Sequence, residues 1–168
     1  TKFYDKNGNL LTSAADPEYI APHCKKYEDY DRVMDAGASS KNIYFIRYAD
    51  LILLYAECLL AENDLAGAKQ QVIRVRNRAK VSTPITASNN TEMLDFIYEE
   101  RMRELGMEGW RRMDLIRRGA DYFAAQVDKY NPFAKGNVQP YHAFYPIPTN
   151  EINMNDGIGA EDQNEGYK

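Results

Sequence analysis

Arginines and carboxylates alternate through residues 100–119, which read ERMRELGMEGWRRMDLIRRG. Six arginines stand there among four acidic residues, Glu100, Glu104, Glu108 and Asp114. Guanidinium groups in such a pattern could bind nucleic acid, bind an anionic ligand, or pair with the protein's own carboxylates. The choice among these three chemistries decides what kind of protein the chain is.

The charge balance of the whole chain argues against nucleic acid. Its 168 residues carry 21 basic and 25 acidic side chains, with a net charge of −4 and a pI near 5.3. Nucleic-acid-binding domains are normally basic, and no run of one sign here is long enough to act as an interaction tail. We therefore expect no nucleic-acid partner.

The position of Arg101 favours internal pairing. A helix is predicted with its N-cap at Asn90 or Thr91 and its end near Leu105, and its apolar stripe is Leu94, Ile97, Tyr98 and Leu105. Arg101 lies on that same stripe, and a charge on an apolar face is costly unless it is paired.

We therefore interpret the segment as a structural ion-pair network rather than a ligand site. Arg101 is expected to meet Glu104 or a carboxylate on another helix, and Arg111 to meet Asp114 or Glu108. Arg112 and Arg118 fit less well and are expected to face solvent. The proposed network members are Glu100, Arg101, Glu104, Glu108, Arg111, Asp114 and Arg117.

No catalytic or metal-binding pattern is visible elsewhere. His23 and His142 are far apart, and no nucleophile elbow or phosphate-binding loop occurs. Cys24 and Cys58 have no metal or redox spacing, and Cys58 lies in an apolar run as a predicted core residue. We expect no metal, no cofactor and no enzymatic activity.

The N-terminal residues 1–42 are polar and irregular. Asn7-Gly8 between alternating flanks predicts a tight β-hairpin. The spacing of Asp5, Asn7, Asn9 and Asp16 also fits a calcium loop, but Leu10 stands where such a loop requires glycine. The hairpin is the favoured interpretation.

Two amphipathic patterns predict a helical hairpin. The first stripe contains Leu51, Leu54, Tyr55, Cys58 and Leu59, and the second contains Leu65, Ala68, Val72, Val75 and Ala79. Asn63 and Asp64 are alternative N-caps of the second helix. Ala56 and Ala68 have the twelve-residue spacing of small residues in a tetratricopeptide repeat. An ordinary helical hairpin is the alternative, and a single repeat unit would need neighbours to bury its faces.

The remaining chain is helical and then loop-rich. A fourth helix is predicted over residues 110–118, ending at Gly119, and a weaker one over 120–130. Beyond residue 131 we expect loops, an extended AFYPIP segment and a brief helix at TNEI. The predicted fold is mainly α, with a tetratricopeptide-like hairpin, further helices, long irregular loops and little β. We expect one domain over residues 1–168, made of an irregular segment (1–42), a helical scaffold (43–130) and a loop-rich tail (131–168).

Four segments, in order, resemble the SusD/RagB family of outer-membrane nutrient-binding lipoproteins. Residues 100–119 resemble its signature E-R-x-x-E-L-x-x-E-G-x-R-x-x-D-L-x-R-x-G, although Arg112 stands where an aromatic residue is common and Trp110 supplies a ring one position earlier. The other three segments are IRYADLILLYAECLLAEND, YPIPTNEINMN and QNEGY. Family members are much longer, so we interpret the chain as the C-terminal part of such a protein.

The resemblance implies a function at the surface of Gram-negative bacteria. Members capture oligosaccharides or other nutrients as the lid of a TonB-dependent, SusC-like transporter, and they are not enzymes. The resemblance also implies a lipid anchor at an N-terminal cysteine that this chain lacks. The shared motifs are scaffold residues, so no ligand site transfers with them. The competing hypothesis is a tetratricopeptide-type protein-interaction scaffold without a small ligand.

Tyrosine is abundant, with thirteen in the chain. A tyrosine ring can stack on a sugar while its hydroxyl forms hydrogen bonds. Tyr27, Tyr30 and Tyr141 lie in predicted loops and are the candidate ligand contacts. Packing within the protein is the alternative for each of them.

Overall fold

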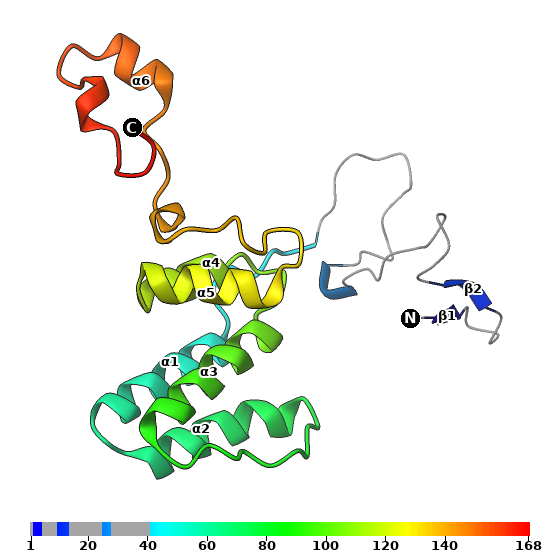
Figure 1. Ribbon diagram of the computed structural model, residues 1–168. Coiled ribbons are helices and arrows are strands. Elements are labelled where there is room, and N and C mark those ends of the chain that lie inside the picture. The colour runs from blue at the N-terminus through cyan, green and yellow to red at the C-terminus, as the bar shows by residue number, and fades with distance from the viewer. Residues whose placement is uncertain (1, 5–9, 14–24, 28–40) are drawn as a thin grey trace. The chain divides into compact units, whose positions relative to one another are not determined.

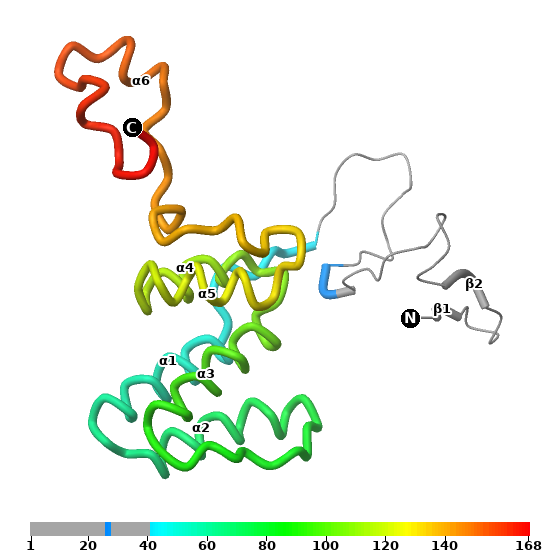
Figure 2. Tube along the Cα trace, in the orientation of Figure 1, coloured from blue at the N-terminus to red at the C-terminus, as the bar shows by residue number. Residues whose placement is uncertain are grey.

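The computed structural model describes residues 2–4, 10–13, 25–27 and 41–168 (Figures 1 and 2). Contacts divide the chain into two compact units, Thr1–Tyr44 and Phe45–Lys168. The boundary lies close to the expected change from the irregular segment to the helical scaffold.

The first unit contains the predicted pair of strands. Strand β1 (Lys2–Tyr4) pairs antiparallel with β2 (Leu10–Ser13), with Lys2 opposite Ser13 and a register irregularity after Phe3. A 3-10 helix, η1, covers Lys25–Tyr27. The antiparallel pairing is confirmed, whereas the Asn7-Gly8 turn and the four residues with calcium-loop spacing lie outside the described residues.

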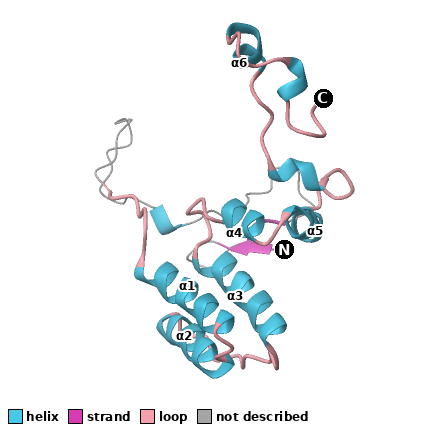
Figure 3. Ribbon diagram, turned by 90° about the vertical axis from the view of Figure 1, so that its left-hand side faces the viewer, coloured by secondary structure: helices cyan, strands magenta, loops and turns pink. Residues whose placement is uncertain are grey.

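The second unit is helical. Helices α1 (Tyr48–Ala61), α2 (Leu65–Arg78) and α3 (Asn90–Glu104) pack against one another (Figures 1 and 3). Helix α4 (Arg111–Arg117) contacts α5 (Ala120–Tyr130), and α5 contacts the 3-10 helix η2 (Pro140–Ala143). Helix α6 (Thr149–Met154) and η3 (Ala160–Asp162) lie in the tail. The mainly α fold with long loops and little β is confirmed.

The helix ends follow local side-chain chemistry. Asp64 is the N-cap of α2, because its Oδ1 accepts a hydrogen bond from the Gly67 amide at 2.8 Å. The N-cap of α3 is Asn89, not Asn90 or Thr91 as predicted: its Oδ1 accepts from the Glu92 amide at 3.0 Å. Helix α4 ends beside Gly119 as predicted, and the φ of 107° at Gly119 is one that glycine adopts without strain.

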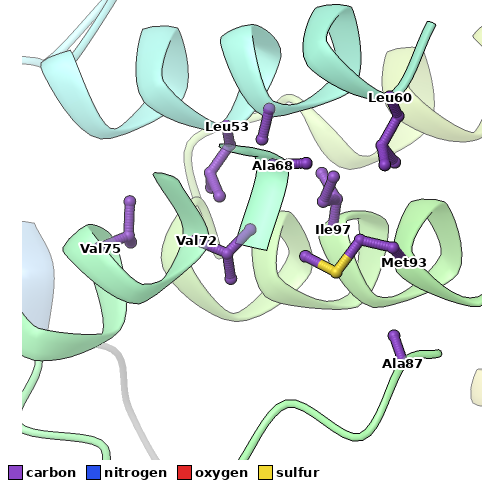
Figure 4. Packing of buried hydrophobic residues seen from close by; sticks show 9 residues of the cluster. Leu53, Leu60, Ala68, Val72, Val75, Ala87, Met93 and Ile97 are labelled. Carbon is purple, nitrogen blue, oxygen red and sulfur yellow. The ribbon is translucent and has the colours of Figure 1, made fainter. Parts of the chain in front are cut away.

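Small residues let α1 and α2 pack closely. Ala56 and Ala68, the pair with tetratricopeptide spacing, are both completely buried. Figure 4 shows the hydrophobic core around them, where α1, α2 and α3 meet. Its buried members are Leu53, Ala56, Leu60, Ala68, Val72, Val75, Ala87, Met93 and Ile97.

The predicted buried face of α1 is wrong. Leu51 and Tyr55 are 51% and 52% exposed, and Cys58 is exposed rather than in the core. The buried stripe is instead Leu53, Ala56 and Leu60. Almost every position of this helix is apolar, so periodicity could not single out one face. The small side chain of Ala56 decides the matter, because only that face allows close approach to α2.

A smaller core joins α4 and α5 to the loop after them. Leu115, Phe123 and Ala143 are buried in it, with partly buried side chains packed around them. Among the described residues, no helix combines the length and the apolar character needed to cross a bilayer.

The two leucines Leu53 and Leu51 test which face of α1 is buried. Leu53→Ala removes a completely buried side chain and should lower the free energy of unfolding by about 2–5 kcal/mol. Leu51→Ala, in the same helix, should change it by no more than about 0.5 kcal/mol. Denaturant unfolding followed by helical circular dichroism measures both. Equal losses would show that the faces have been assigned incorrectly.

Candidate functional site

Arg101 of α3 holds three helices together. Its side chain is 2% exposed, with Nη1 2.7 Å from Oδ1 of Asp50 in α1 and Nη2 2.9 Å from Oδ1 of Asp114 in α4. Both carboxylates are themselves buried. Arg101 was expected to meet either Glu104 or a carboxylate on another helix. The structure shows the second arrangement, with Asp50 and Asp114 as the partners.

The electrostatics keep this buried guanidinium charged. Burial alone lowers the pKa of Arg101, but hydrogen bonds and charge from Asp114 and Asp50 outweigh that effect and raise the pKa above its usual value. Arg117 supplies a second cation: it binds both carboxylate oxygens of Glu57 at 2.9 and 3.1 Å and Asp114 at 3.0 Å. Each buried carboxylate is therefore neutralised by an arginine.

A second group of charges ties the start of α1 to the end of α3. Arg47 lies 2.9 Å from Glu104 through Nη1 and 2.8 Å from Glu108 through Nη2. It also donates to the main-chain oxygen of Glu104 at 2.9 Å. Arg78 of α2 pairs with Glu104 as well. Glu104 and Glu108 thus connect the arginine-rich segment to the helical hairpin.

A third group joins α2, α3 and the linker between them. Glu100 Oε2 accepts hydrogen bonds from Arg76 Nη1 at 3.0 Å and Arg103 Nη2 at 2.9 Å. Arg76 also donates to the side chain of Thr83 at 2.6 Å. Arg76 and Glu100 are both buried, so this pair fixes the linker against the hairpin.

The expectation that Arg112 and Arg118 face solvent is wrong. Arg112 Nη2 donates to the carbonyls of His142 and Ala143, both at 3.0 Å, and its guanidinium lies 4.2 Å from the Tyr145 ring centroid. Arg118 pairs with Asp95 and lies 3.9 Å from the Tyr122 ring centroid. Nearby aromatic faces and carbonyls make these sites favourable for planar cations.

All six arginines of residues 100–119 therefore contact the protein itself. Arg111, the sixth, donates to the main-chain oxygen of Tyr98 at 3.1 Å, a partner that the sequence did not indicate. The arrangement orients helices and offers an anionic ligand no uncommitted guanidinium within this segment. Sequence reasoning missed Arg47, Asp50, Glu57 and Arg76. The signal available for Asp50 and Glu57 was their seven-residue spacing in an otherwise apolar helix.

A cavity of about 730 Å³ lies beside Tyr141, one of the three candidate ligand contacts. Its lining residues are Ala120, Gln139, Pro140, Tyr141, Phe144, Asn164, Glu165 and Gly166. The Tyr141 ring packs edge-to-face on Tyr167, with centroids 5.1 Å apart. Gly166 lies against that ring so closely that an added Cβ would be 2.3 Å from it. The cavity is therefore formed where the C-terminal residues fold back on η2.

The other two candidate tyrosines belong to the N-terminal part of the chain. Tyr27 lies in η1 of the first unit, with its ring 6.3 Å from that of Tyr44. Tyr30 lies outside the described residues. Across residues 2–4, 10–13, 25–27 and 41–168, no three histidine, cysteine or carboxylate side chains are grouped as metal ligands.

Replacing Arg101 tests the structural role of the network. Arg101→Ala leaves Asp50 and Asp114 buried without this cation, and the free energy of unfolding should fall by about 3–5 kcal/mol. Arg74→Ala is the control, because Arg74 is exposed and its side chain interacts with Gln71 and Tyr48 rather than with a buried carboxylate; it should cost about 0.5 kcal/mol or less. Thermal or denaturant unfolding measures both. An unchanged melting temperature in Arg101→Ala, together with lost ligand binding, would refute the structural account.

Tyr98 gives the network a pH dependence at high pH. Burial, followed by the charge of Glu57, raises its pKa from 10.0 to about 12. Between these values the unfolded chain releases the Tyr98 proton while the folded chain retains it, so the free energy of unfolding falls as pH rises. Tyr98→Phe should show a shallower fall over this range. The tyrosinate absorbance difference between the two proteins should report ionisation near pH 12, and a difference centred on pH 10 would contradict the buried environment.

Comparisons with known proteins identify the family. The SusD family model matches residues 2–167. SusD-like protein P25 of Formosa agariphila is 34% identical over 77% of this chain, and the starch-binding protein SusD of Bacteroides thetaiotaomicron is 32% identical over 81%. The chain spans 25% and 23% of the lengths of these two relatives, and no solved structure gave a significant match. A family-model match over nearly the whole chain, together with these relatives, shows that this chain belongs to the SusD family.

Proposed function

We propose that this chain is part of a cell-surface protein that binds a nutrient, most simply an oligosaccharide, and passes it to a transporter. The observation that carries the proposal is the SusD-family match over residues 2–167. A relative that is 32% identical over 81% of the chain is named a starch-binding protein. These likenesses support glycan binding without specifying the glycan.

In the proposed arrangement the longer protein is the lid of a TonB-dependent, SusC-like transporter in the outer membrane. A lipidated N-terminal cysteine of the longer protein would anchor it at the cell surface. The ion-pair network supports a scaffolding role for residues 45–168, because its buried charges fix the helices in one arrangement. The protein would act by binding, without catalysis.

An exposed, mainly apolar face of α1 supports a second candidate function. Tyr48, Leu51, Tyr55 and Cys58 recur at helical spacing along α1 and are all exposed. An apolar face of this kind is typical of repeat helices that stack on a neighbour or bind a peptide. It supports the second hypothesis, a tetratricopeptide-type interaction scaffold without a small ligand.

Isothermal titration of the longer protein and of this chain with neutral and anionic oligosaccharides tests the proposal. We expect the longer protein to bind one glycan class, and the comparison with this chain to show whether residues 1–168 contribute to the site. Co-purification with a TonB-dependent transporter from outer-membrane extracts is the second expected result. A folded longer protein that binds no glycan and no transporter would favour the scaffold hypothesis.

A further inference from the structure

Phe144 is an aromatic side chain presented at the edge of the cavity beside Tyr141. It is 60% exposed, and no ring or cation packs on it among the described residues. The neighbouring Tyr145 is also exposed, but the Arg112 guanidinium lies 4.2 Å from its ring centroid and so occupies one face of that ring. Phe144 therefore offers an uncovered aromatic surface next to a hollow of about 730 Å³, within the range of small-molecule sites.

The backbone that carries Phe144 is held at four successive carbonyls. Arg112 donates to those of His142 and Ala143, both at 3.0 Å. Tyr167 Oη donates to the Phe144 carbonyl at 3.0 Å, and Asn164 Nδ2 donates to the Tyr145 carbonyl at 2.7 Å. Because these contacts come from both α4 and the C-terminal residues, the backbone that carries the ring is fixed before any ligand arrives, which lowers the entropy that binding must remove.

A glycine, Gly166, also lines the cavity. Gly166 has φ of 88°, and its backbone lies directly against the Tyr141 ring. A side chain there would displace the ring, since an added Cβ would stand 2.3 Å from it. The glycine thus lets the C-terminal backbone pack closely on Tyr141, and Phe144 lines the same cavity.

The polar groups of the lining complement hydroxyls rather than anions. Gln139, Asn164 and Glu165 provide amide and carboxylate groups, and no lysine or arginine lines the cavity. Glu165 has no ion-pair partner among the described residues. A negative charge at the cavity would repel sulfate or carboxylate substituents, whereas carboxylate and amide groups accept hydrogen bonds from sugar hydroxyls.

We infer that this cavity is a subsite for an uncharged sugar ring, with Phe144 as the stacking surface and Glu165 and Asn164 as hydroxyl partners. The inference rests on the proposed function and gives it a substrate class, neutral rather than sulfated or uronic-acid glycans. A sugar has apolar C–H faces and peripheral hydroxyls, which match an aromatic surface bordered by polar side chains.

Saturation-transfer NMR on this chain tests the subsite directly. The probes are maltose, cellobiose, mannobiose and xylobiose, with digalacturonic acid as the anionic comparison. We expect transfer to at least one neutral disaccharide and none to digalacturonic acid. Phe144→Ala should weaken the neutral complex about tenfold, the loss of about 1.4 kcal/mol that one aromatic contact contributes.

Phe133→Ala is the matched control, because Phe133 is 95% exposed and does not line the cavity. It should leave the signal unchanged. Glu165→Lys should reduce the discrimination against digalacturonic acid, whereas Glu161→Lys, an exposed acid outside the cavity, should not. Circular dichroism melting curves of the variants confirm that each is folded before its signal is compared.

The outcomes separate this inference from the proposed function. No transfer to any neutral disaccharide, or equal transfer in Phe144→Ala and Phe133→Ala, overturns the subsite. If the longer protein still binds a glycan by titration, the proposed function then stands with its site elsewhere. If the longer protein binds no glycan while this chain binds a neutral sugar at Phe144, the subsite stands and the nutrient-binding assignment of the whole protein fails.

Discussion

The buried guanidinium of Arg101 is the constraint on which the helical unit depends. Removing a charged group from water is costly, and here Asp50 and Asp114 offset that cost from two other helices. The three residues lie on three different helices, and Asp50 is far from the other two in sequence, so both pairs form only when α1, α3 and α4 reach their final positions. Most misplaced arrangements would bury the arginine without its carboxylates and are disfavoured accordingly. In this way the pairing specifies one arrangement of the helices, whereas apolar contacts tolerate several.

Apolar packing and ion pairing have different roles in this unit. The contact of Ala56 with α2 brings the hairpin together at close range, and that contact is short-range in sequence. Arginines then link the hairpin and the later helices to one another. Arg47 reaches the end of α3, and Arg112 reaches η2 through two carbonyls. The signature of residues 100–119 thus acts as a set of connectors, which explains how an acidic protein uses so many arginines.

Features governed by neighbouring residues could be predicted from the sequence. The N-cap of α2, with Asp64 as one of two candidates, the stop at Gly119 and the small pair of the hairpin depend on local chemistry, and the structure contains all three. The buried face of α1 could not be predicted, because its apolar residues surround the helix and only the tertiary partner distinguishes the faces. The contacts of Arg112 could not be predicted for a related reason. Its partners are backbone carbonyls about thirty residues later in the chain, and a backbone carbonyl has no residue type that a sequence could reveal.

The candidate ligand contacts also depend on tertiary partners that the local sequence does not reveal. Tyr141 could be named from its loop position, yet whether its ring is covered depends on Gly166 and Tyr167, which fold back from the C-terminus. Phe144 was not singled out, because a lone phenylalanine in a loop is ordinary until its backbone is seen to be fixed. The tail hydrogen bonds that fix it involve the QNEGY ending, a segment that resembles the family motif. The QNEGY motif therefore shapes the cavity in two ways: it holds the backbone around Phe144 in place, and it supplies Asn164 and Glu165 to the lining.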